Sequence, residues 1–174
     1  MTAGHDEADA GSGGAGAPPE DHEANQVFTD LTREYSTSRI RVQWFASRCI
    51  HTAACVKALP IVFDPRRRPW IDVDAADADA IADAVLKCPT GALHYVRADG
   101  TPEPVSNDVS VRVVRDGPYL VRGEIAITGP EGEVIRKDSR VALCRCGKSR
   151  HMPFCDNTHR ASGIRIDSAP QQTP

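Results

Sequence analysis

The stretch "CRCGKSRHMPFCDNTH", residues 144–159, gathers three thiols and one imidazole in a short segment. Cys144 and Cys146 have one residue between them, so on a strand, or at its end, both side chains point to the same face. Cys155 and His159 are four residues apart, the spacing of one face of a helix, and Asp156 is available to cap its start. Four such ligands suit a tetrahedral metal ion or a [2Fe-2S] cluster.

The gap between the first two cysteines separates these two interpretations. Zinc sites usually place two to four residues between paired cysteines, whereas only Arg145 lies between Cys144 and Cys146. Two pairs of ligands also suit two metal atoms better than one. The spacing therefore favours a two-iron cluster, and a structural zinc-binding interaction module is the alternative.

The segment resembles the CDGSH iron-sulfur (NEET) motif, CxCxxSxxxPxCDxxH. The matching residues are Cys144, Cys146, Ser149, Pro153, Cys155, Asp156 and His159. The resemblance implies a [2Fe-2S] cluster with Cys144 and Cys146 on one iron and Cys155 and His159 on the other. Asn157 stands where the family usually has Gly, and Thr158 replaces Ser. Asn tolerates a left-handed backbone better than most residues, so the departure changes the expected fold little.

A second group of cysteines lies earlier in the chain. "CIHTAAC", residues 49–55, and the remote Cys88-Pro89 match the bacterial ferredoxin run, with Thr52 in place of the second cysteine. Cys49, Cys55 and Cys88 can hold a [3Fe-4S] cluster, or a [4Fe-4S] cluster whose fourth iron binds His51, Thr52 or water. Three buried structural cysteines are the alternative. The stretch also resembles the divergent single-cluster ferredoxin domain found beside CDGSH modules.

The remaining sequence predicts an α+β protein, with a small ferredoxin-like α/β domain followed by a β-rich CDGSH iron-sulfur domain. Alternation predicts strands over 39–45, 91–96, 109–114, 119–128 and 133–143, and apolar spacing predicts a helix over 77–87, ended by Pro89. A hairpin-like turn is expected at 64–69, and Trp44 and Trp70 are expected in the core. The predicted domains are a disordered acidic tail over 1–26, a ferredoxin-like domain over 36–98, a linker over 97–108, a CDGSH domain over 108–167 and a disordered tail over 168–174.

Composition limits the functions that remain. Six cysteines in a chain with no export signal indicate metal or redox chemistry rather than disulfides, so a cytoplasmic protein without membrane contact is expected. The net charge of -3 does not suggest nucleic acid as a partner. No catalytic motif is apparent, so we do not expect an enzyme.

Electron transfer, between the clusters or with a redox partner protein, is the expected function. Donation of a cluster or iron to an apo-acceptor protein, or redox sensing, is the alternative. The resemblance also leaves a homodimer open, because family members with one CDGSH motif per chain are often homodimers.

Overall fold

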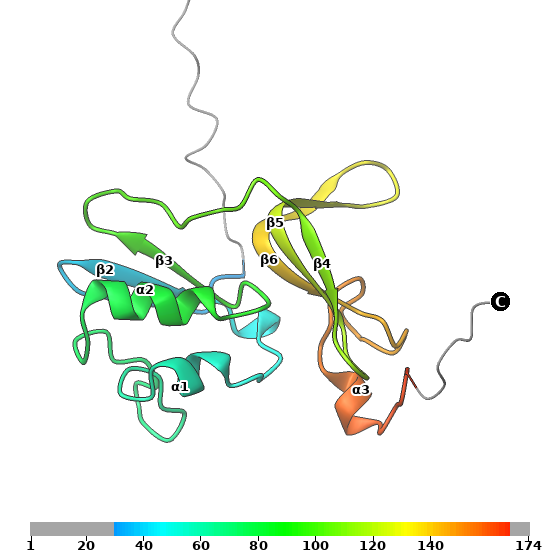
Figure 1. Cartoon of the computed structure of the whole chain (residues 1–174), viewed down its shortest axis with the longest axis horizontal. Coiled ribbons are helices and arrows are strands. Elements are labelled where there is room, and N and C mark those ends of the chain that lie inside the picture. Colours follow the sequence, from blue (N-terminus) through cyan, green and yellow to red (C-terminus); the bar gives the residue numbers. More distant parts are fainter. Residues whose placement is uncertain (1–29, 168–174) are drawn as a thin grey trace, which may run out of the picture.

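The computed structural model describes residues 30–167, so the two tails that the sequence predicts over 1–26 and 168–174 lie outside it. The fold is α+β, as predicted, and contains two three-stranded antiparallel sheets. The sheets divide the described chain into an N-terminal unit, residues 30–98, and a C-terminal unit, residues 108–167, which lie next to each other (Figure 1).

The N-terminal unit is a small sheet covered by short helices. Its elements are β1 (Arg33–Ser36), β2 (Ile40–Trp44), the 3-10 helix η1 (Ala46–Arg48), α1 (Ala54–Ala58), α2 (Ala78–Leu86) and β3 (Leu93–Arg97). The strand order is β1-β2-β3. Neither β1 nor α1 follows from the sequence analysis.

Alternation in β2 places Ile40 and Val42 in the core, and Val42 lies in register with Tyr35 on one side and Tyr95 on the other. The helix predicted over 77–87 is confirmed as α2. Its N-cap is Asp77, whose carboxylate accepts a hydrogen bond from the backbone N–H of Ala80 at 2.8 Å. The buried side chains of α2 close the core of the sheet; they are Ile81, Ala82, Ala84 and Val85.

The hairpin-like turn expected at 64–69 is also present. Phe63 and Ile71 form an antiparallel bridge, and the backbone N–H of Asp64 donates to the carbonyl of Trp70 at 2.9 Å. Phe63 and Ile71 are almost fully buried, so the turn adds two large side chains to a core that has few aromatic residues.

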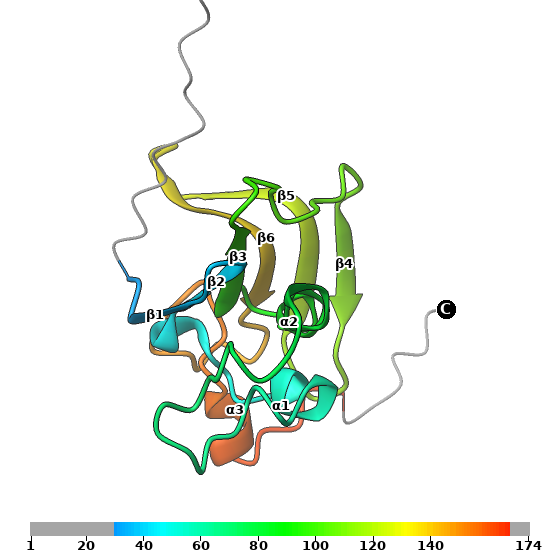
Figure 2. The same ribbon diagram turned by 90° about the vertical axis from the view of Figure 1, so that its left-hand side faces the viewer.

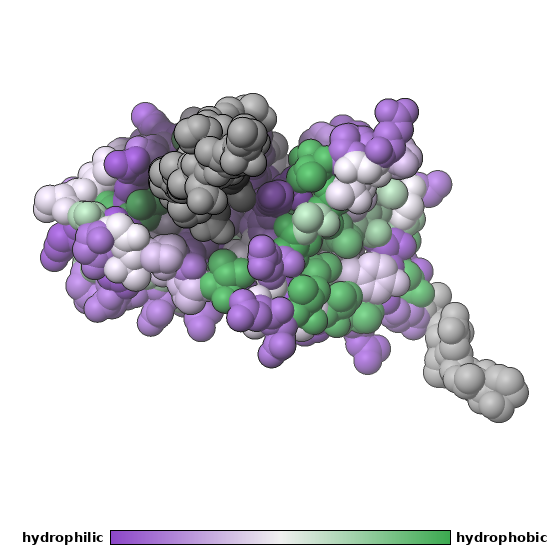
Figure 3. All heavy atoms as spheres, turned by 90° about the horizontal axis from the view of Figure 1, so that it is seen from above, coloured by the Kyte–Doolittle hydropathy of each residue, from purple (hydrophilic) through white to green (hydrophobic). Residues whose placement is uncertain are grey.

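The C-terminal unit is an antiparallel sheet with one short helix. Its elements are β4 (Ser110–Val113), β5 (Tyr119–Thr128), β6 (Val134–Leu143) and α3 (Thr158–Ala161). Val121, Ile125 and Val141 form one buried apolar cluster of this sheet. The outer strand β4 leaves Val111 and Val113 exposed, and hydrophobic residues gather on this half of the surface (Figure 3).

This sheet also packs against the N-terminal unit (Figure 2). Arg140 of β6 is 1% exposed, and its guanidinium donates to the carbonyl of Leu93 at 2.9 Å and to Glu103 at 3.0 Å. Glu103 belongs to the predicted linker, yet its carboxylate also accepts from the backbone N–H of Tyr95 at 2.6 Å. Buried polar contacts therefore join the two units.

Within residues 30–167, every helix is too short or too polar to traverse a lipid bilayer.

Candidate metal centres

The first pair of the 144–159 segment lies immediately after β6. The Cys144 and Cys146 sulfurs are 3.7 Å apart. Two ligands about 2.3 Å from one tetrahedral metal lie about 3.8 Å apart, so this spacing fits a shared metal atom. The backbone N–H of Cys144 donates to the carbonyl of Pro153 at 2.8 Å, which folds the segment back on itself.

The second pair also approaches closely, but not along one helix. The sulfur of Cys155 lies 3.7 Å from Nδ1 of His159. The prediction that both residues share a helical face is wrong, because α3 begins only at Thr158. Cys155 instead follows a β-bridge between Leu143 and Phe154, and its backbone N–H donates to the carbonyl of Ala142 at 2.8 Å. Contact with β6 positions the thiol, and the next turn positions the imidazole.

That turn depends on Asp156 and Asn157. The Asp156 carboxylate accepts from the backbone N–H of Arg150 at 3.0 Å and of Thr158 at 2.9 Å, so it binds the first N–H of α3 and holds the preceding loop. These hydrogen bonds hold the pKa of Asp156 far below its ordinary value. Asn157 has a φ of 71°, the left-handed conformation that the sequence analysis allowed for.

The candidate ligands of this segment differ in how their surroundings shift their pKa values. Burial opposes ionisation of Cys144, but the backbone N–H groups of Ser149 and Gly147 outweigh it and lower the pKa of the thiol. Burial raises the pKa of Cys155, with a contribution from the nearby Cys144 and Cys146. Burial, helped by the charge of Arg160, lowers the pKa of His159, which favours the neutral imidazole that binds metals.

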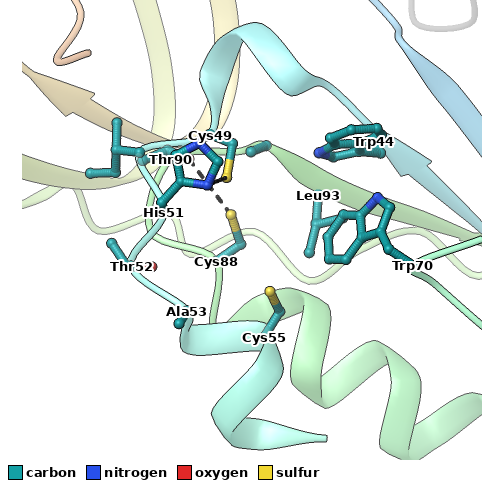
Figure 4. Close-up of a pocket in the computed structure, with 12 residues that line it drawn as sticks. Trp44, Cys49, His51, Thr52, Ala53, Cys55, Trp70, Cys88, Thr90 and Leu93 are labelled. Atoms are coloured by element: carbon teal, nitrogen blue, oxygen red, sulfur yellow. Dashed lines mark hydrogen bonds between the residues drawn. The ribbon is translucent and has the colours of Figure 1, made fainter. Parts of the chain in front are cut away.

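The earlier cysteines converge as well. Cys49, Cys55 and Cys88 line one cavity, and their sulfurs point into the same space (Figure 4). Cys49 follows η1, Cys55 lies in the first turn of α1, and Cys88 comes just after α2. Residues 39 positions apart therefore meet because α1 begins, and α2 ends, at the same cavity.

Of the proposed fourth ligands, His51 and Thr52 both line this cavity. His51 has a φ of 54°, and its Nδ1 is 3.9 Å from the sulfur of Cys49. The Thr52 hydroxyl accepts a hydrogen bond from the backbone N–H of Ala54 at 3.4 Å. His51 thus places a ring nitrogen near one cysteine of this group.

Two tryptophans give this cavity one apolar wall. Trp44 and Trp70 pack edge to face, with ring centroids 5.2 Å apart, and both line it (Figure 4). They pack against the core, as expected, and also contribute to the site. Burial in these surroundings raises the pKa of Cys49, and raises that of Cys55 to about 11, so metal binding at these thiols must displace protons.

Sequence reasoning missed one residue of this centre. The Thr90 hydroxyl lies 3.6 Å from the sulfur of Cys88, in contact distance of a predicted ligand. Its position in "CPTG", two residues beyond the cysteine, was the available signal.

The first centre is the group of Cys49, Cys55 and Cys88, and the second centre is formed by the two pairs of the 144–159 segment. The donor sets of both centres fit iron-sulfur clusters, since thiols predominate in each and imidazole joins them in the second. Among residues 30–167, no group of three or more His, Cys, Asp or Glu side chains converges on a single ion position. The close approaches in the 144–159 segment are pairwise. Family models match both parts: residues 35–98 match a divergent 4Fe-4S mono-cluster, and residues 116–160 match an iron-binding zinc finger of CDGSH type.

The chain joins a divergent 4Fe-4S mono-cluster domain to a CDGSH-type domain, and it belongs to these iron-sulfur families. Two relatives, both named "Uncharacterized protein YjdI", come from Escherichia coli strain K12 and Escherichia coli O157:H7. Each is 33% identical over 63 residues, which cover 36% of this chain and 83% of the relative.

The two matches agree with the placement of the cysteines. The mono-cluster domain contains Cys49, Cys55 and Cys88, and the CDGSH-type domain contains the pairs of the 144–159 segment. Both are iron-sulfur binding domains.

Proposed function

We propose that the CDGSH-type domain holds a [2Fe-2S] cluster, with Cys144 and Cys146 on one iron and Cys155 and His159 on the other. The observation that supports this ligation most directly is the pairwise geometry, with 3.7 Å between the members of each pair. A bound cluster of this kind would supply a one-electron redox couple. Ser149 and Asp156 hold the loop that carries the ligands.

In the mono-cluster domain we propose a [3Fe-4S] or [4Fe-4S] cluster on Cys49, Cys55 and Cys88. With three thiols on the cavity, a fourth iron would need another donor, and His51 is our candidate. Trp44 and Trp70 would exclude water from one side of this centre. A less solvated centre is one of the conditions that set the reduction potential of a cluster.

The function that we propose is electron transfer with a protein partner, without catalysis by the chain itself. Support comes from two iron-sulfur binding domains in one chain and from the surroundings of His159. This residue lines an open cavity of about 360 Å³, together with Arg115, Arg160 and Arg165. Asp116 also lines it, but the Asp116 carboxylate already accepts from Arg165 and from the backbone of Ile166. The resulting positive charge suits an acidic partner surface.

Electron paramagnetic resonance before and after dithionite tests this function. We expect a reduced [2Fe-2S] signal and a separate signal from the first centre. Cys146→Ala should remove the [2Fe-2S] signal and leave the signal of the first centre. Cys88→Ala should do the reverse. His151→Ala is a control in the ligand loop of the second centre that should keep both signals.

Other outcomes point to the alternatives. Clusters that do not change on reduction but pass to an apo-ferredoxin would contradict electron transfer and favour a cluster donor. Stoichiometric zinc in anaerobically prepared protein would favour a structural module.

A further inference from the structure

One side chain joins the surroundings of the two centres. Ile50 directly follows Cys49 and is 6% exposed, yet it does not belong to the core of its own domain. It is buried in one apolar cluster with Leu120, Ala142 and Cys155. The residue next to a ligand of the first centre therefore packs in the same cluster as a ligand of the second.

The chain segments around Ile50 agree with this placement. The segment between β2 and α1 lies beside the segment that follows β6 in both ribbon views (Figure 1, Figure 2). The backbone N–H of Cys155 donates to the carbonyl of Ala142, a member of the cluster, at 2.8 Å. One peptide unit and one packed apolar cluster thus separate Cys49 from Cys155.

Buried ions hold this junction in place. Arg48, which precedes Cys49, contacts Asp138 of β6 at 3.3 Å, and the two side chains are 7% and 1% exposed. Arg136 of β6 also pairs with Asp138 and donates to the carbonyl of Thr90 at 2.7 Å. The Thr90 hydroxyl in turn lies 3.6 Å from Cys88. Polar contacts therefore hold strand β6 next to two ligands of the first centre, Cys49 and Cys88.

Burying these ions contributes little to stability, so attaching the two domains is a weak explanation for them on its own. Buried ion pairs contribute less to stability than well-packed apolar side chains of similar volume, because each ion loses its hydration. Their directional hydrogen bonds do fix one relative position of the groups that they join. An electron route requires such a fixed separation between its donor and its acceptor.

We propose that the Ile50 junction is a built route for electron transfer within the chain, an inference that rests on the proposed electron-transfer function. An external one-electron donor reduces the first centre. The first centre then loses that electron and is oxidised, and the second centre gains it and is reduced. The neutral His159 ligand favours this direction, because it makes the second centre less negative than an all-cysteine [2Fe-2S] cluster and so raises its potential. The electron finally leaves to the protein partner.

The test uses the full-length, oxygen-free protein with both centres loaded. Ile50→Ala removes the bridging side chain. Ile125→Ala is its matched control, because Ile125 is similarly buried, at 8%, but belongs to the separate apolar cluster of Val121 and Val141. Ile50→Val keeps most of the side chain and replaces Ile50→Ala if that variant loses a centre.

Two readouts are needed. In the wild-type chain, the spin relaxation of the reduced second centre should be faster when the first centre is also paramagnetic. After rapid mixing with less than one equivalent of reductant and freeze-quenching, the second centre should gain its electron severalfold more slowly in Ile50→Ala than in Ile125→Ala. The optical spectra of the two variants should match.

The results separate this inference from the proposed function. Two reducible centres with no magnetic interaction, or equal rates in Ile50→Ala, Ile125→Ala and wild type, would overturn the route and leave electron transfer with a partner intact. A chain whose second centre cannot be reduced would overturn both.

Discussion

At the residue scale, the ligand candidates were accessible from the sequence because their chemistry depends on residue type and spacing. Cys144 and Cys146 are close because one residue separates them just beyond a strand. The arrangement of Cys155 and His159 was not accessible in the same way. Their spacing fits a helix, but a β-bridge and the left-handed Asn157 produce their approach instead.

The backbone of Asn157 leads to a prediction about stability. At a φ of 71°, a residue other than Gly or Asn costs roughly 1–2 kcal/mol. Asn157→Ala should therefore reduce the free energy of unfolding by about 1 kcal/mol, whereas Asn157→Gly should leave it nearly unchanged. Chemical denaturation of the loaded protein measures both. Equal losses in the two variants would contradict a left-handed turn before His159.

His159 leads to a prediction about acid. A neutral imidazole must stay unprotonated to bind iron, so protons compete with the metal for its nitrogen. The visible absorption of the second centre should fade faster at pH 6 than at pH 8. His159→Cys should reduce this difference, because a thiolate ligand has no imidazole to protonate. A His159→Cys variant with unchanged acid sensitivity would refute the assignment.

At the element scale, strong patterns were reliable and short elements were not. The helix predicted over 77–87 has a regular apolar face and an Asp77 cap, and it is present as α2. Helix α1 has five residues and follows Ala53 in a left-handed conformation, so it is too short for a periodic signal. Strand β1 buries only Tyr35 and lacks alternation.

Strand β6 contains the most consequential unpredicted feature, the buried Asp138. Burial opposes its ionisation, but His94 and Arg136 outweigh that effect and hold its pKa far below the ordinary value. Asp138→Asn should cost about 3–5 kcal/mol of unfolding free energy, because the buried Arg136 and Arg48 would each lose their ion pair with Asp138. Asp79→Asn breaks an exposed pair with Arg97 and should change stability little. Similar small effects in both variants would contradict a structural role for the buried network.

His94 of β3 gives this network a dependence on pH. Burial would lower its pKa, but Asp138 and Glu103 outweigh burial and raise it, and Arg140 is the nearby cation. Because the pKa of His94 is higher in the folded chain, protonated His94 stabilises the fold fully at pH values below its ordinary pKa of 6.5. This contribution is lost as the pH rises through the pKa of the folded state. The stability difference between wild type and His94→Gln should therefore shrink as pH increases above neutrality. A difference that grows with pH would contradict the pairing.

At the scale of the whole molecule, the sequence predicted two cysteine-based centres but not how they are joined. Residues such as Arg48, Asp138 and Arg140 belong to types that are mostly exposed, so no local pattern marks them as buried. Ile50 gave no signal either, since one apolar residue beside a cysteine is unremarkable in a sequence. Contacts between the two domains bring these residues together, and only tertiary structure supplies that information.

The central claim is that both halves of the chain hold iron-sulfur clusters. Quantification of iron and acid-labile sulfide in oxygen-free protein, with an absorption spectrum, tests it most directly. We predict a coloured protein with about five to six iron atoms and about six sulfides per chain. A colourless protein that contains neither element in stoichiometric amounts, or that contains zinc in their place, would contradict the claim.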